Sequence, residues 1–263
     1  MSKLFATAEH CQYRVCGLGL LIVGEMAQVD AVAVSAKKYS MEERCARIVE
    51  RHRHRFKVRK QQLVVANLSR IVSAFLKLSN RKGFHATSLR ELAEASGLSM
   101  GGLYTYFDSK ETLLVMVLDE VTCSVKEMLK SVPPAVNSDP ETHLLWIIDA
   151  HIRLTEAMQP WFVFAFMEAK AFPVNLRRAA VDSELMTEKA LVDVIEKGIA
   201  KGAFSADSPP LFASLVKPLL QDWYVKRSKY RKRNVDIDSY IGAVQSMVGK
   251  TLIPTMKRRH PAS

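Results

Sequence analysis

The fold of this chain is decided by residues 81–114, which read RKGFHATSLRELAEASGLSMGGLYTYFDSKETLL. Ser88 and Glu91 have the spacing of a capping box, and such a box predicts a short helix over Leu89–Ser96. Gly97 then ends that helix, because glycine readily adopts the left-handed conformation found after a helix C-terminus. The stretch therefore begins with a helix of about two turns, followed by a tight turn.

A second helix is predicted to start directly after this turn. Ser99 can accept a hydrogen bond from its first free amides, and Leu98 can pack on Leu103 as a hydrophobic staple. Two helices joined by such a short turn have the spacing of a helix-turn-helix, whose second helix enters the major groove of DNA. The residues predicted to read bases share the exposed face of this second helix: Met100, Gly101, Gly102, Tyr104 and Thr105.

Other side chains of the motif are predicted to hold the DNA backbone without reading its sequence. Tyr106 and Lys110 bring a phenol and an ammonium group to the start of the next helix, whose free amides also suit a phosphate. Thr87 and Ser88 stand at the start of the helix over 89–96 and are predicted to do the same. For Ser88 the alternative is capping alone.

The order of these motifs resembles the DNA-binding domain of TetR/AcrR-type transcriptional regulators. The resemblance rests on the pair Gly83–Phe84 and on the segments TSLRELA, GLS and LYTYFDSKE. It implies an all-α fold, with an N-terminal three-helix helix-turn-helix domain followed by a helical domain for effector binding and dimerisation. The chain departs from the family at Met100, where many relatives carry a basic or polar residue, so the operator sequence stays open.

The resemblance also implies a function. A regulator of this kind is a cytoplasmic homodimer, most commonly a repressor, that binds a near-palindromic double-stranded DNA operator and is released by a small-molecule effector. No cofactor, metal or catalytic residue is expected, because the sequence has no nucleophile elbow, phosphate loop or metal-ligand spacing. The basic segment over 37–60 favours the alternative, a sequence-independent architectural DNA-binding protein, whereas the phosphate and base contacts predicted around the second helix disfavour it.

The chain before the motif divides into two parts. Residues 1–40 are interpreted as a poorly ordered extension or as the result of a start assigned too early; a secretory signal peptide is the less favoured alternative. Their apolar run over 15–24 is about half of a membrane span, so no membrane attachment is expected. Residues 41–60 are interpreted as a basic arm that contacts phosphates or, alternatively, as a solvated helical lead-in.

Residues 61–112 are predicted to form the helix-turn-helix domain, residues 113–255 the ligand-binding and dimerisation domain, and residues 256–263 a basic tail. Apolar spacing and proline positions predict further helices over 110–130, 140–159, 161–171 and 175–203. Aromatic side chains with few polar neighbours suggest an effector pocket, although each could be core. The candidate pocket residues are Trp146, His151, Trp161, Phe162, Phe166 and Met167.

The last two helices are predicted to form the dimer interface. Apolar pairs recur every four residues from Leu211, and a similar face follows Asp236, so each helix can meet two neighbours. The alternative is that both faces belong to the core. Pro218 predicts a kink. Between the helices, residues 226–233 hold six cations, interpreted as a solvated helix end or, more specifically, as a site for the phosphates of an acyl-coenzyme A.

Overall fold

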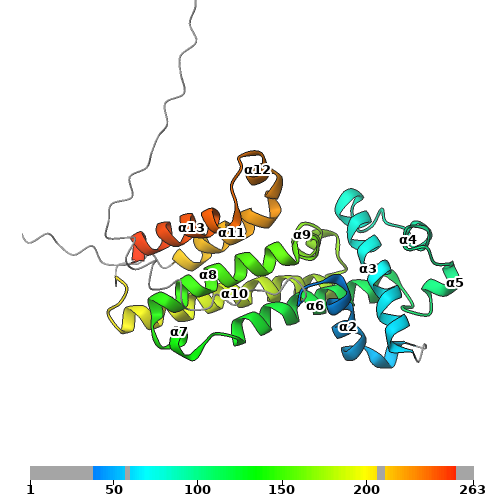
Figure 1. Cartoon of the computed structure of the whole chain (residues 1–263), viewed down its shortest axis with the longest axis horizontal. Coiled ribbons are helices and arrows are strands. Elements are labelled where there is room, and N and C mark those ends of the chain that lie inside the picture. The colour runs from blue at the N-terminus through cyan, green and yellow to red at the C-terminus, as the bar shows by residue number, and fades with distance from the viewer. Residues whose placement is uncertain (1–37, 57–59, 206–210, 253–263) are drawn as a thin grey trace, which may run out of the picture. The chain divides into compact units, whose positions relative to one another are not determined.

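The computed structural model describes residues 38–56, 60–205 and 211–252, and these residues contain no strand (Figure 1). They all belong to one compact unit, Val34–Ser263. The prediction of an all-α fold is thereby confirmed, whereas the predictions for residues 1–37 and 256–263 lie outside the described residues. The helices are α2 (Met41–Arg51), η1 (Arg53–Arg55), α3 (Gln61–Lys82), α4 (Leu89–Ser96), α5 (Met100–Leu103), α6 (Lys110–Lys130), α7 (Pro134–Ser138), α8 (Pro140–Ala157), α9 (Gln159–Met167), η2 (Ala169–Ala171), α10 (Val174–Ala200), α11 (Phe212–Val225), α12 (Arg227–Lys232) and α13 (Ile237–Leu252).

Helices α3, α4 and α5 form the predicted helix-turn-helix domain. The capping box is complete, because the Ser88 hydroxyl accepts from the Glu91 amide at 3.2 Å and the Glu91 carboxylate accepts from the Ser88 amide at 3.1 Å. Gly97 ends α4 with a φ of 66°, in the left-handed region. The Ser99 hydroxyl then accepts from the Gly102 amide at 3.0 Å and so starts α5. Local capping thus fixes the turn between the two helices.

An aromatic core joins this domain to the helices that follow it. The ring of Phe75 in α3 lies 6.2 Å from that of Phe84 and 5.0 Å from that of Phe164 in α9, measured between centroids. Phe172 packs on Phe84 from the other side, with the centroids 5.7 Å apart. Because such a core is close-packed, a shift of α9 is transmitted to α3 and to the turn at Phe84.

A second core holds α8, α10, α11 and α13 together. Its centre is made of fully buried side chains, among them Ile148, Leu191, Trp223 and Val248. The Trp223 indole N–H is satisfied, since it donates to the Glu156 carboxylate at 2.9 Å. Helix α11 continues through Pro218.

Two predicted boundaries change around Pro160. Helix α8 ends at Ala157 rather than at residue 159, and α9 begins at Gln159 with Pro160 in its first turn. Proline fits there because the first turn of a helix needs no backbone donor. Pro160 therefore opens the aromatic helix instead of separating it from its neighbour, and a short 3₁₀ helix, η2, completes the segment.

Candidate DNA-binding surface and ligand cavity

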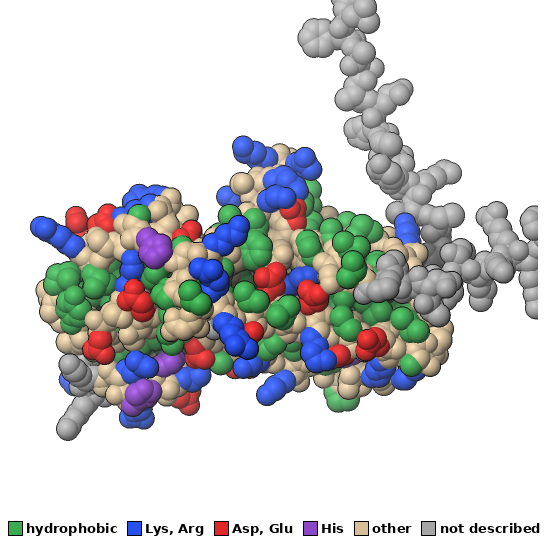
Figure 2. Space-filling model, turned by 180° about the vertical axis from the view of Figure 1, so that it is seen from behind, with side chains coloured by type: hydrophobic (Ala, Val, Ile, Leu, Met, Phe, Trp, Pro, Cys, Tyr) green, Lys and Arg blue, Asp and Glu red, His purple; other side chains and the backbone are tan. Residues whose placement is uncertain are grey.

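Of the predicted base-reading residues, Met100, Gly101 and Gly102 lie on the short helix α5, and Tyr104 and Thr105 lie in the turn directly after it. Met100 is 38% exposed and Tyr104 is 44% exposed, whereas Leu103 between them is fully buried. Thr105 is half-buried, and its hydroxyl donates to the Gly102 carbonyl at 2.7 Å. Figure 2 shows hydrophobic side chains gathered at the α5 end of the molecule. An apolar surface of this kind matches thymine methyl groups better than guanine acceptors.

Gly101 is an exposed glycine that the fold itself does not require. A Cβ atom placed there would have no atom within 4 Å, whereas at Gly102 it would meet the Ser99 hydroxyl at 3.2 Å. Glycine weakens a helix by about 1 kcal/mol relative to alanine, so its presence at 101 gives the chain no internal advantage. What Gly101 provides is a bare backbone on the outer face of α5.

Two of the predicted phosphate contacts are instead committed inside the domain. Tyr106 is only 3% exposed, and its hydroxyl accepts from the Asn67 side-chain amide at 2.7 Å. Lys110 donates to the carbonyls of Phe84, His85 and Thr87 at 2.8, 3.3 and 3.0 Å. Burial lowers the pKa of Lys110. In this structure Tyr106 is bonded to α3 and Lys110 to the loop before α4, so both polar groups have partners inside the domain, and that they contact phosphates stays a prediction.

Of the other two predicted phosphate contacts, Thr87 is buried and Ser88 is exposed. Thr87 is fully buried, and its hydroxyl donates to the Gly83 carbonyl at 2.9 Å, so it closes the loop rather than meeting a phosphate. Ser88 is exposed and caps α4. Arg90, in the first turn of α4, is also exposed and has no resolved ion pair with another described residue. The sequence analysis did not single out Arg90, although it lies within the TSLRELA segment.

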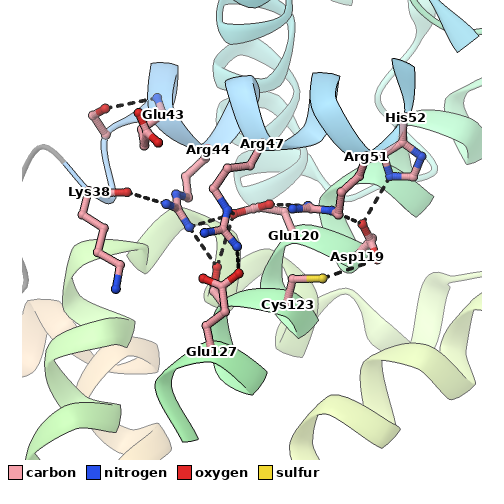
Figure 3. Close-up of polar contacts among 12 residues, drawn as sticks. Lys38, Glu43, Arg44, Arg47, Arg51, His52, Asp119, Glu120, Cys123 and Glu127 are labelled. Carbon is pink, nitrogen blue, oxygen red and sulfur yellow. Dashed lines mark hydrogen bonds and ion pairs between the residues drawn. The ribbon is translucent and has the colours of Figure 1, made fainter. Parts of the chain in front are cut away.

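Three arginines of the basic segment before α3, Arg44, Arg47 and Arg51, point from α2 toward α6 (Figure 3), whereas Arg53 and Arg55 are exposed. Arg44 is 1% exposed and pairs with the fully buried Glu120 of α6 at 2.9 Å. Arg47 pairs with Glu127 and Glu120, and Arg51 pairs with Glu120 and, at 2.8 Å, with Asp119. His52 lies 3.2 Å from Asp119. We call Arg44, Arg47, Arg51, His52, Asp119, Glu120 and Glu127 the α2–α6 ion cluster.

This cluster corrects the interpretation of residues 41–52, whereas Arg53, His54 and Arg55 are exposed and residues 57–59 lie outside the described residues. Helix α2 is neither a free phosphate-binding arm nor a solvated lead-in, because its arginines neutralise carboxylates of α6 and its apolar side chains Cys45 and Ile48 are fully buried. The sequence shows three arginines at helical spacing, but their partners lie about 70 to 80 residues further along the chain.

A cavity of about 390 Å³ lies in the second domain between α6, α8, α9, α10 and α11, within the size range of small-molecule sites. Four of the predicted pocket residues line it, namely His151, Phe162, Phe166 and Met167. Trp146 and Trp161 do not line this cavity, so the structure does not bring them together with the other four. Most of the remaining wall is apolar and comes from Leu118, Val121, Val125, Ala165, Ala169, Ala180, Val181 and Tyr224.

One end of the cavity is polar. Lys217 of α11 is only 5% exposed, and its ammonium group lies 3.1 Å from Nε2 of His151 in α8. Burial lowers the pKa of Lys217 to about 8 and that of His151 well below its ordinary value. The hydroxyl of Thr187 in α10 and Nδ1 of His151 are buried without a hydrogen-bond partner. The sequence signal for this end was a lysine within the apolar run of α11.

Helix α9 connects the cavity to the helix-turn-helix domain. Its C-terminal half supplies Phe166 and Met167 to the cavity wall, and the Glu168 carboxylate directly after it accepts from the Phe84 amide at 2.7 Å. At its other end, the Pro160 carbonyl accepts from the Asn80 side chain in α3 at 2.9 Å. A ligand that moves α9 would therefore move contacts at the end of α3 and at the loop before α4.

The outer faces of α11 and α13 remain uncovered. Leu211 and Leu215 are 67% and 62% exposed, and Met247 of α13 is 48% exposed beside small exposed residues. The opposite faces are buried in the second core. Helix α11 thus has a second, exposed apolar face, whereas the exposed face of α13 is made mostly of small and polar residues around Met247.

Of the six cations over 226–233, three are paired inside the chain. Lys226 and Lys229 pair with Asp222, and Arg227 makes bonds of 3.0 Å to Glu156. Figure 2 shows Lys and Arg side chains gathered over α12. Arg231, Lys232 and Arg233 are exposed.

The described part of the chain contains neither a metal-binding cluster nor a membrane-spanning helix. No group of three or more His, Cys, Asp or Glu side chains is arranged to hold a metal ion. None of the helices over 38–56, 60–205 and 211–252 combines the length and apolar character needed to cross a bilayer.

Known proteins that are similar to this chain include bacterial transcriptional regulators. Residues 71–117 match the family model of bacterial regulatory proteins of the tetR family. The chain is 25% identical over 140 residues to the HTH-type transcriptional regulator HbdR of Aromatoleum sp., which is 52% of this chain and 58% of that protein. It is 28% identical over 132 residues to the transcriptional repressor KstR2 of Rhodococcus jostii, which is 48% of this chain and 62% of that protein. The chain thus spans about three fifths of these relatives.

Solved structures share the fold over a larger part of the chain. The TetR-family regulator PfmR of Thermus thermophilus superposes with a TM-score of 0.53 and 25% identity, covering 70% of this chain and 97% of that one. FadR of Bacillus subtilis, solved in complex with stearoyl-CoA, superposes with a TM-score of 0.50 and 16% identity, covering 68% of this chain and 96% of that one.

Proposed function

We propose that this chain, which belongs to the TetR family of bacterial regulatory proteins, is a ligand-responsive transcriptional repressor. The observation that carries the proposal is the capped helix-turn-helix over 71–117, whose α5 keeps Met100, Gly101 and Tyr104 exposed. The proteins it resembles are transcriptional regulators rather than enzymes. The protein would act in the cytoplasm, where its operator lies.

DNA binding would use α5 for sequence and neighbouring side chains for position. The bare backbone at Gly101 lets α5 approach the floor of the major groove, and Tyr104 and Thr105 lie where they can contact base edges or thymine methyl groups. Ser88 and Arg90 at the exposed start of α4 would contact phosphates. These replace Tyr106, Lys110 and Thr87, whose polar groups are used within the domain.

The operator would be read by a homodimer, because one helix of a single turn reads too few bases for specificity. The partner surface we propose is the exposed face of α11 and α13, since two such faces form a self-complementary four-helix contact. Changing both Leu215 and Met247 to Asp should convert the dimer to a monomer in light scattering after gel filtration. Leu63→Asp, at a leucine of α3 that is 49% exposed, is the matched control and should leave the dimer intact.

The effector would be a small, largely apolar molecule in the cavity between α6 and α11. Release follows if the effector binds more tightly to a conformation in which α9, and with it the Glu168–Phe84 contact, has moved. An acyl-CoA is one such effector, given the stearoyl-CoA bound to FadR. On this chain the exposed cations Arg231, Lys232 and Arg233 would then meet its phosphates.

The alternative function is sequence-independent DNA binding. Its main support was the basic segment before α3, and the α2–α6 ion cluster removes three of those cations from the surface. The remaining positive charge would still give salt-dependent affinity for any duplex.

Fluorescence anisotropy decides between the two functions. The protein is titrated onto its own upstream intergenic DNA and onto a scrambled duplex of equal length, across a salt series. A specific regulator should prefer the native duplex by about a thousandfold or more at physiological salt. Equal affinities that fall together as salt rises would overturn the proposal in favour of the architectural protein.

A further inference from the structure

At the polar end of the cavity several hydrogen-bond donors have no acceptor, and the Glu184 carboxylate, which also lines the cavity, makes no hydrogen bond to them. Lys217 carries three N–H groups when charged, and its one resolved hydrogen-bond partner in the described chain is Nε2 of His151. Thr187 is fully buried, and its hydroxyl has no hydrogen-bond partner in the described chain. All three residues line the cavity. Buried donors without acceptors are costly, so this arrangement calls for oxygen atoms supplied from outside the chain.

The tautomer of His151 follows from the same geometry. Burial and the neighbouring ammonium keep the imidazole neutral, because both lower the pKa of His151. Nε2 faces the Lys217 ammonium and must accept, so the single ring proton sits on Nδ1. Nδ1 is itself buried without a partner. His151 therefore adds another unused donor to the polar end.

The carboxylates nearest this end have other commitments. One oxygen of Glu184 accepts from the Gln221 side chain at 2.6 Å, and one oxygen of Glu188 accepts from the Ser214 hydroxyl. Neither makes a resolved ion pair with Lys217, although their charges oppose the lowering of its pKa by burial. The remaining walls of the cavity are mainly apolar.

We propose that the cavity binds an apolar monocarboxylate whose carboxylate accepts hydrogen bonds from Lys217, His151 and Thr187. The apolar body of the ligand lies against Phe162, Phe166 and the α6 side chains. This inference deepens the proposed function, because it names the chemical class of effector for the same cavity. A carboxylate supplies what the site lacks, namely negative charge and up to four acceptor positions.

The test uses ligands that differ only at the polar end. Octanoate, decanoate and 4-phenylbutyrate are each titrated into the full-length protein by calorimetry, beside the primary amide of the same acid and octanoyl-CoA. Each carboxylate should bind at least about tenfold more tightly than its amide, since a charged hydrogen bond is stronger than a neutral one. Equal binding of acid and amide, tighter binding of octanoyl-CoA than of octanoate, or no binding of any carboxylate at about 1 mM would overturn the proposal.

Variants of the polar end give a second, independent readout. Lys217→Met keeps the side-chain length and removes the charge, and it should reduce carboxylate affinity at least about tenfold while leaving amide affinity nearly unchanged. Thr187→Val removes one donor and should cause a smaller loss. The matched control is Lys189→Met, which removes an exposed lysine of α10 outside the cavity and should change nothing. Carboxylate binding that survives Lys217→Met would contradict the assignment.

Binding should also weaken as the Lys217 ammonium loses its proton above about pH 8. The charged or titratable groups around it are His151 on α8, Glu184 and Glu188 on α10, Lys170 at η2 and Tyr224 on its own helix. The cavity residues from α6 and α9 contribute no titratable group. In Lys217→Met the same pH change should leave the residual affinity constant.

Failure of this inference can be told apart from failure of the proposed function. Specific operator binding without any carboxylate affinity would keep the repressor and reject the ligand class. Carboxylate binding that depends on Lys217, without any preference for the native duplex, would keep the ligand class and reject the repressor.

Discussion

The two buried charged clusters of this protein differ in whether their charges are matched within the chain. In the α2–α6 ion cluster each arginine has a carboxylate partner, and Glu120 at its centre meets three of them. At the cavity, Lys217 has a neutral imidazole as its resolved partner. A cluster that is complete within the chain holds the fold, whereas an incomplete one is arranged for a molecule that the chain does not contain.

The same distinction sorts the residues of the helix-turn-helix domain. Tyr106, Lys110 and Thr87 have polar partners inside the domain, and the bonds of Lys110 and Thr87 fix the loop before α4. Tyr104 and Gly101 face outward, and neither has a polar partner that the fold requires. Functional residues are therefore better recognised by unused polar groups and open space than by residue type alone.

The largest expected effect is the loss of the central carboxylate from the complete cluster. Glu120→Gln leaves three buried or half-buried arginines without their common partner and should lower the free energy of unfolding by about 3–5 kcal/mol. Urea unfolding followed by circular dichroism measures this loss. The control is Glu127→Gln at the exposed edge of the cluster, which should cost no more than about 1 kcal/mol. Similar losses of stability for the two variants would show that Glu120 contributes no more to the cluster than Glu127 does.

At the incomplete cluster around Lys217, a substitution is expected to raise the free energy of unfolding rather than to lower it. Lys217→Met removes a buried charge that makes no ion pair with a carboxylate and should raise the unfolding free energy of the ligand-free protein by about 1–3 kcal/mol. The same urea titration applies, in the absence of any carboxylate. A loss of stability would mean that Lys217 holds the fold, and the contrast between the clusters would then disappear.

A third effect tests whether Lys110 is structural. Lys110→Met removes the donor to three loop carbonyls and should lower the unfolding free energy by about 1–3 kcal/mol. Affinity for native and scrambled DNA should fall only as far as the folded fraction does, which anisotropy at a temperature well below unfolding can check. A large affinity loss in a fully folded variant would return Lys110 to the DNA surface.

The stability difference between the wild type and Lys217→Met should depend on pH. The pKa of Lys217 is lowered from 10.5 to about 8 in the folded protein, so the unfolded chain binds more protons between these values. Stability of the wild type therefore rises from pH 8 to 10.5 relative to the variant, and the deficit present at pH 7 closes. Paired urea titrations at the three pH values measure the change. A constant difference would indicate that the lysine is not held in a lowered-pKa environment.

The smallest stability effect is expected at the outward face of α5. Gly101→Ala should raise helix stability by at most about 1 kcal/mol, because an added Cβ meets no other atom. The same methyl group should weaken binding to the native duplex, since it lies between α5 and the groove. Anisotropy beside urea unfolding measures both quantities. Unchanged affinity would show that the bare backbone at 101 is not used for close approach.

The order of helices from α3 to α6 could be predicted because its signals are local. Capping partners such as Ser88 and Glu91 lie three residues apart, and glycines such as Gly97 end a helix through their own backbone. The outward position of α5 followed from apolar spacing. The directions of Tyr106 and Lys110 did not, because they depend on Asn67 and on loop carbonyls brought near by the fold.

By itself, the sequence determined the all-α fold, the helix-turn-helix and the resemblance to the TetR family, since these rest on interactions over a few residues. Only the tertiary structure decided which charges are matched. Arg44 meets a carboxylate 76 residues away, and Lys217 meets His151 from 66 residues away without a direct ion pair to a described carboxylate. Charge pairing depends on distances in space and on burial, so a pattern of residue types can show that cations are present but not whether they stabilise the fold or bind a ligand.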